Sequence, residues 1–139
     1  MFTPINMRSV NTYKNVAVET SVTTADPHQL VNLLFDALIQ SMGIAKSAMQ
    51  SGDIAKKSQA INKSVRILEE GLKAGLDMQR GGEVAQSLRS LYDYSIFRLT
   101  EANFKNDVDM VQEVISAVAP VADSWKQIRE QVVPAPRAA

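Results

Sequence analysis

The most regular stretch of the chain covers residues 107–132 and reads DVDMVQEVISAVAPVADSWKQIREQV. Its apolar residues recur every three or four positions, which is the spacing of one face of an α-helix. They are Val111, Val114, Ile115, Val118, Val121, Ala122, Trp125, Ile128 and Val132. This stripe predicts a helix over about 107–132. Pro120 lies inside it, and because proline removes one helical hydrogen bond, we expect a kink near residues 116–120 or a split helix there.

Three earlier stretches show the same spacing. Asp26-Pro27 begins a helix over about 27–50, because an Asp side chain caps free amides and proline is tolerated in the first turn. Ser51-Gly52-Asp53 separates it from a second helix over about 53–80, and Gly81-Gly82 precedes a third over about 83–105. Since short connections favour antiparallel neighbours, the sequence predicts an all-α fold, an antiparallel up-down four-helix bundle.

The two ends of the chain lack this periodicity. Residues 1–25 predict an N-terminal arm, extended or with a short helix, placed ahead of a bundle domain over residues 26–133. Residues 134–139 contain two prolines and small side chains, and we expect a flexible tail there.

Composition excludes several classes of protein. The chain has 139 residues, 45% of them hydrophobic, with no cysteine and a formal net charge of zero, which suits a single domain with one core. Without cysteine there is no disulfide framework, thiolate zinc site or cysteine nucleophile. Zero net charge gives no general attraction to nucleic acid. The start of the chain does not resemble a signal peptide, and no apolar run is long enough to span a bilayer, so we expect a cytoplasmic protein without membrane insertion.

Side chains that carry chemistry are few and dispersed. The single histidine, His28, falls in the first turn of a predicted helix, where an imidazole is most often structural. Glu69 and Glu70 are adjacent and diverge around a helix, and Asp93 and Tyr94 point away from the core stripe on which Tyr92 lies. The sequence therefore predicts no catalytic residue, no cofactor and no metal, and it disfavours an enzyme.

The predicted helices carry more apolar surface than one bundle face needs. Beside the main stripes lie Val31, Phe35, Met42 and Met49 on the first helix, and Ala60, Ile67, Gly71, Ala74 and Met78 on the second. Methionine and small residues suit a groove that accepts varied side chains, so these residues are candidates for binding another chain. The alternative is that they widen the core or lie under the arm. The pattern leaves both interpretations open.

A set of short motifs resembles the FliS family of flagellar export chaperones. The matching residues cover about 10–129 in order: Tyr13, Asp26-Pro27-His28-Gln29-Leu30, Leu34-Phe35-Asp36, Gly52-Asp53, Gly71-Leu72-Lys73-Ala74-Gly75-Leu76-Asp77, Gly81-Gly82-Glu83, Leu91-Tyr92-Asp93-Tyr94, Ala102-Asn103 and Trp125-Lys126. Each motif is weak alone, and the ordered set is specific. Pro120 departs from the family pattern, in which the last helix is expected to be unbroken.

The resemblance implies a chaperone that binds the C-terminal segment of flagellin, prevents its premature polymerisation and delivers it to the export-gate protein FlhA. It also implies that an arm carrying Val10, Tyr13 and Val16 covers part of the client surface and takes part in gate docking. Such a protein is expected to be a monomer or weak homodimer. The alternative class is a self-associating helical structural or adaptor protein with no unfolded client.

Overall fold

The computed structural model describes the backbone of residues 26–132 and the side chains of residues 26–128. The elements are α3 (Pro27–Ser51), α4 (Ile54–Arg66), a π-helical continuation η1 (Ile67–Lys73), α5 (Gly82–Lys105) and α6 (Val108–Val132). No strand occurs in this part of the chain, which confirms the predicted all-α class. The arm over 1–25, with Val10, Tyr13 and Val16, and the tail over 134–139 lie outside the described residues.

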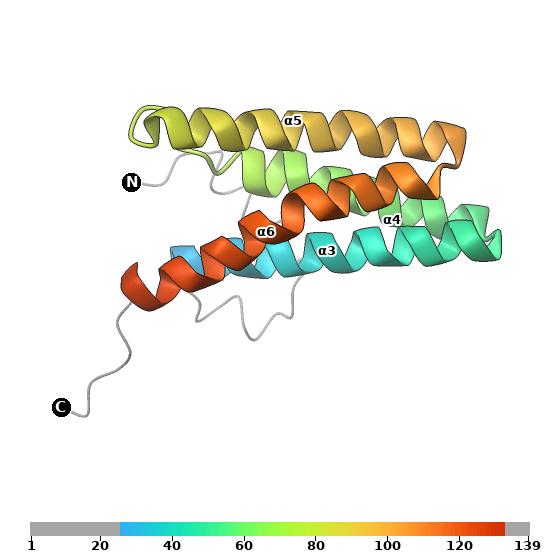
Figure 1. Ribbon diagram of the computed structural model, residues 1–139, viewed down its shortest axis with the longest axis horizontal. Helices are drawn as coiled ribbons and strands as arrows, with labels where there is room; N and C mark the ends of the chain where they lie inside the picture. Colours follow the sequence, from blue (N-terminus) through green and yellow to red (C-terminus); the bar gives the residue numbers. More distant parts are fainter. Residues whose placement is uncertain (1–25, 133–139) are drawn as a thin grey trace, which may run out of the picture.

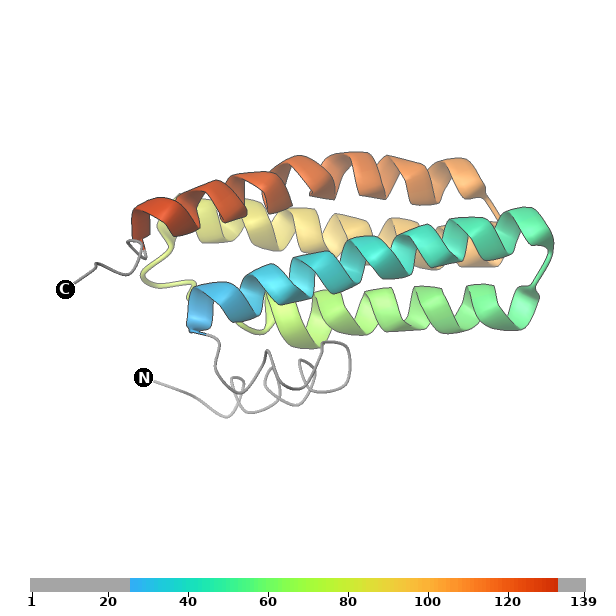
Figure 2. The ribbon, with the colours of Figure 1, turned by 90° about the horizontal axis from the view of Figure 1, so that it is seen from below.

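Consecutive helices run in alternating directions and form a closed set of four neighbours (Figures 1 and 2). The helix α3 packs against α4 and α6, and α5 packs against α6 and against α4 with η1. Each helix thus turns its apolar face toward the centre. The arrangement is the up-down bundle that the short connections predict.

Local hydrogen bonds begin and end the helices. Asp26 caps α3 by accepting from the Gln29 amide at 2.7 Å, and Asp53 caps α4 by accepting from the Lys56 amide at 3.1 Å. Asp107 caps α6 through the amides of Asp109 and Met110. Gly52 ends α3 in the left-handed conformation with φ of 77°, which only glycine adopts without steric cost.

The core takes side chains from all four helices; of the predicted stripe of α6, Val111, Val114 and Val118 are fully buried, whereas Ile128 is 41% exposed. Side chains with at most 1% exposure include Leu34, Phe35, Leu38, Met42, Ile61, Ile67, Leu68, Leu99, Val111, Val114 and Val118. Burying a large aliphatic side chain contributes about 1.5–3 kcal/mol, so this set supplies the main driving force for folding.

The sequence predicts a second helix over about 53–80, and the predicted C-terminal boundary of this helix is wrong. Regular α-helix stops at Arg66, and the π-helix that follows ends at Lys73, where the Ala74 amide donates to the Glu69 carbonyl at 3.2 Å. A turn then occupies residues 74–81, because the Asp77 carboxylate accepts from the amides of Gln79 and Arg80 at 3.1 and 2.9 Å. Such local bonds compete with helical ones and favour a turn.

Pro120 does not split the last helix. The element α6 is continuous through it, and its axis bends along the chain (Figure 1). Pro120 is exposed, so the Ser116 carbonyl that loses its amide partner stays close to solvent. A proline on the outer face bends a helix without leaving a buried polar group unpaired.

Candidate functional site

An apolar cavity of about 340 Å³ lies near the end of the bundle where α3 and α5 begin. Its walls are Val31 and Phe35 of α3, Gly71 and Leu72 of η1, Gly75 and Leu76 of the turn, Val84, Ala85, Leu88 and Tyr92 of α5, and Val121 and Trp125 of α6. Every helix of the bundle except the regular part of α4 thus contributes to it. Pockets for drug-sized ligands measure about 300–1,000 Å³, so this one admits only a few side chains.

The glycines at this end of the bundle lie where the backbone comes close to neighbouring residues. A Cβ on Gly71 would lie 2.8 Å from Cδ1 of the buried Leu34, so η1 sits too close to α3 for any larger residue there. Gly75 also lines the cavity, and a Cβ there would lie 3.1 Å from the carbonyl oxygen of Gly71. A Cβ on Gly81 would lie 2.6 Å from Cβ of Ala85, so the start of α5 leaves no room for a side chain at that position either.

Trp125 forms the wall that α6 contributes, and two contacts hold it. Its ring stacks on His28 with centroids 4.3 Å apart and planes 5° from parallel, and its Nε1 donates to the His28 carbonyl at 3.0 Å. Both contacts reach the first turn of α3. His28, as predicted, has a structural position in that turn.

Two charged residues of the turn line the cavity, Asp77 and Arg80. The amide of Arg80 is the main cause that lowers the pKa of the Asp77 carboxyl, and the amide of Gln79 adds to it. The guanidinium Nε of Arg80 lies 3.9 Å from Asp77 Oδ2, and the two side chains are 89% and 57% exposed. The cavity is therefore apolar inside with a charged rim.

The predicted binding residues divide into three groups. Val31, Phe35 and Gly71 come together at the cavity. Ala74 and Met78 are half-buried in the turn, outside the lining. Met42, Met49, Ala60 and Ile67 pack in the core with exposures of 0%, 7%, 6% and 0%. Contact between these four and a client requires the bundle to open, and it stays a prediction.

Sequence reasoning missed the walls that α5 and α6 contribute. Val84 is 69% exposed, and Leu88 and Val121 are half-buried at the cavity. Their apolar spacing looks like ordinary core stripe, so nothing in it marks a cavity.

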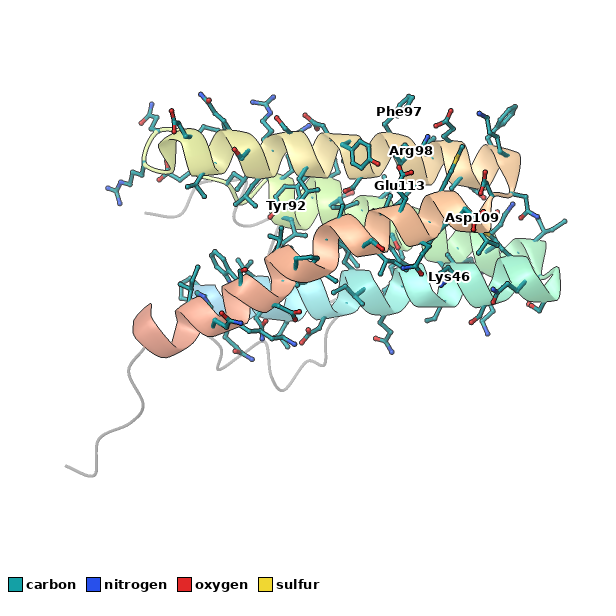
Figure 3. All side chains as sticks on the ribbon, viewed as in Figure 1. Lys46, Tyr92, Phe97, Arg98, Asp109 and Glu113 are labelled. Carbon is teal, nitrogen blue, oxygen red and sulfur yellow. The ribbon has the colours of Figure 1, made fainter. Side chains whose placement is uncertain are left out.

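An ion-pair cluster joins α5 to α6 on the outside of the bundle. Arg98 binds Glu113 at 2.8 Å and Glu101 at 2.8 Å, and Tyr94 donates a hydrogen bond to Glu113. The Arg98 and Glu113 side chains approach each other between the helices, whereas Phe97 points away from them (Figure 3). The hydrogen bonds of Arg98, then of Tyr94, lower the pKa of Glu113.

Asp93 has the surface role expected of it. Its carboxylate pairs with Lys73 Nζ at 2.7 Å and raises the pKa of Lys73 through that hydrogen bond. Tyr92 is buried at 2% exposure, whereas Tyr94 is 40% exposed, so these three neighbours do not converge on one point.

Among the side chains of residues 26–128, no group of three or more His, Asp or Glu is arranged to hold a metal ion. None of the described helices combines the length and apolar character needed to cross a bilayer.

Comparison with known proteins decides the family. The profile of the family described as "Flagellar protein FliS" matches residues 9–132. This chain belongs to the FliS family. The flagellar secretion chaperone FliS of Salmonella typhimurium is 42% identical over 119 residues, covering 86% of this chain and 88% of the relative. FliSB of Pseudomonas aeruginosa is 37% identical over 122 residues, covering 88% and 96%.

The match extends over the whole described bundle and into the arm. Vibrio cholerae FliS is 35% identical over 120 residues, again covering 86% of this chain. The FliS resemblance drawn from the ordered motifs is thereby confirmed. The relatives named here are flagellar secretion chaperones.

Proposed function

We propose that this protein is a cytoplasmic export chaperone that binds the disordered C-terminal segment of flagellin and prevents its premature polymerisation. The observation that carries the proposal is the apolar cavity, whose walls come from α3, η1, α5 and α6. A client segment that folds into an amphipathic helix on binding can insert its largest apolar side chains there. The proposal includes no catalytic role.

Ordering a flexible segment costs part of the contact free energy, about 2–5 kcal/mol. The cavity of about 340 Å³ supplies anchoring for a few side chains only. We therefore expect the client to extend beyond it along the same helices, past Val84, a wall residue that is 69% exposed. The core residues Met42 and Ile67 contribute only if the bundle opens.

The arm is proposed as a lid. Asp26 follows it directly, and Val31 lies about 7.5 Å further along α3 at 1.5 Å per residue. A segment tethered this close competes effectively for the cavity. Val10, Tyr13 and Val16 are the residues proposed to leave the bundle when flagellin binds and to dock on FlhA during delivery.

Deletion of residues 1–18 tests the lid. If the arm covers the cavity, the apparent affinity for flagellin equals the affinity of the open form multiplied by the fraction of molecules that are open. The truncated protein should therefore bind flagellin more tightly. It should dock on FlhA more weakly, because the proposed docking residues are removed. Unchanged affinity in calorimetry, with the truncated bundle still folded, contradicts the lid.

A second function has one observation in its favour. Phe97 and Phe104 on α5 and Ile54 on α4 are 64%, 89% and 71% exposed, and such residues also suit a self-associating adaptor. Light scattering after size exclusion, with and without a flagellin C-terminal peptide, separates the two. A monomer or weak dimer that forms a 1:1 complex supports the chaperone, and a tight dimer indifferent to peptide supports self-association.

A further inference from the structure

Arg80 is the only cationic residue among the described residues that line the cavity. Its side chain is 89% exposed, and its contact with Asp77 is long, with 3.9 Å between Nε and Oδ2. The guanidinium carries five N–H donors in a planar fork. Most of them remain available to a chain that arrives at the cavity.

Backbone amides stabilise the charge of Asp77 more than the Arg80 side chain does. Its Oδ1 accepts from the backbone amides of Arg80 and Gln79 at 2.9 and 3.1 Å, and these bonds fix the carboxylate within the turn. They also lower the pKa of Asp77, with the Arg80 amide as the main cause. The Arg80 side chain is therefore free to exchange its long contact with Asp77 for a shorter one with another carboxylate.

The size of the cavity decides which part of a client meets the rim. About 340 Å³ admits a few side chains, so the backbone of the segment and its remaining side chains must pass over the edge. On a helix, the residues three or four positions from an inserted side chain lie on the same face. These are the positions that can reach Arg80.

We infer that Arg80 selects among apolar segments by pairing with an acidic side chain one helical turn from the residue that enters the cavity. The inference rests on the proposed binding of the flagellin C-terminal segment and specifies its chemistry: an amphipathic helix with an Asp or Glu beside its anchoring apolar residue. Because Arg80 is exposed, the pair should change affinity about two- to fivefold.

A double-mutant cycle tests the pairing. The probe is a synthetic peptide of the cognate flagellin C-terminal segment, in which each Asp or Glu is replaced singly by its amide. Calorimetry measures binding of each peptide to the unsubstituted full chain and to the Arg80→Gln variant. The control is Arg89→Gln, an exposed arginine on α5 that pairs with Asp93 at 4.0 Å and does not line the cavity.

One amide substitution should weaken binding to the full chain two- to fivefold and have no further effect in Arg80→Gln, while Arg89→Gln behaves as the full chain does. If no acidic position couples to Arg80 although the unmodified peptide binds, the inference is wrong and the proposed function stands. If the unmodified peptide does not bind the folded full chain at all, the proposed function fails and the inference fails with it.

Discussion

The indole ring of Trp125 lies parallel to the imidazole of His28, with centroids 4.3 Å apart, and donates through Nε1 to the His28 carbonyl at 3.0 Å. The two residues are 97 positions apart in sequence, so the contact joins the first turn of α3 to the second half of α6. Trp125 also lines the apolar cavity. The Trp125 wall of the cavity and the first turn of α3 are thus held together by one pair of residues.

Trp125→Phe should weaken the contact with His28 while keeping an aromatic ring at that position. The phenyl ring retains much of the stacking area and loses the hydrogen bond, which contributes about 0.5–1.5 kcal/mol to the free energy of unfolding. Urea unfolding followed by circular dichroism measures the change. No loss of stability relative to the original chain would mean that the Nε1 bond does not form in solution.

Gly71→Ala and Gly43→Ala should change stability in opposite directions. A Cβ on Gly71 lies 2.8 Å from Leu34 Cδ1, and Leu34 is fully buried, so overpacking should cost about 1–3 kcal/mol. A Cβ on Gly43 meets nothing within 4 Å in the middle of α3, so alanine there should stabilise the helix by about 0.5–1 kcal/mol. Urea denaturation of both variants provides the comparison, and equal shifts of the same sign would contradict the close packing of η1 on α3.

Pro120→Ala should raise the stability of the bundle. Pro120 is exposed within a continuous helix, and alanine restores one backbone hydrogen bond and relieves the clash with the preceding turn. We expect a gain of about 1–3 kcal/mol in the free energy of unfolding. Thermal and urea unfolding measure it. A loss of stability would show instead that the bend of α6 is required for packing against α3.

The Arg98 cluster should make stability depend on acid pH. Hydrogen bonds from Arg98, then from Tyr94, lower the pKa of Glu113 below its ordinary value of 4.5. A lowered carboxyl pKa adds stability that is complete above the unfolded value and disappears as the pH falls through the folded one. Stability should therefore decrease as the pH drops below about 4.5.

Glu113→Gln should flatten that decrease, because the amide does not titrate. Asp123→Asn, at an exposed carboxyl of the same helix, is the matched control and should leave the slope close to that of the original chain. Urea midpoints over pH 3–7 give the comparison. Identical slopes for the original chain and Glu113→Gln would exclude the cluster as a source of the acid dependence.

The helices were predictable because their information is local. Asp26, Asp53 and Asp107 cap helices where the sequence placed helix starts, and the stripe from Val111 to Val118 is buried as its spacing required. The end of the second helix was not predictable from apolar spacing. Leu68, Leu72 and Leu76 recur every four residues, and Leu76 lies beyond the last helical residue, Lys73. The hydrogen bonds of Asp77 to its own turn decide that boundary.

The candidate site was predictable only in part, because a cavity is defined by side chains from helices far apart in sequence. The helices carry more apolar residues than one core-facing side needs, and this surplus identified Val31, Phe35 and Gly71. All three line the cavity. The same argument selected Met42 and Ile67, which are fully buried. Spacing on one helix cannot distinguish these cases, since the packing of α5 and α6 decides which flank is covered.

The cavity is most directly tested by two exposed apolar residues near opposite ends of α5. Val84 is 69% exposed and lines the cavity, whereas Phe104 is 89% exposed and does not, so both should tolerate aspartate without unfolding. The measurement is the affinity for the flagellin C-terminal segment by calorimetry. Val84→Asp should weaken binding about tenfold or more, as expected from losing a buried valine contact, and Phe104→Asp should bind like the original chain. Full binding by Val84→Asp, or an equal loss in both variants, would contradict client binding at the cavity.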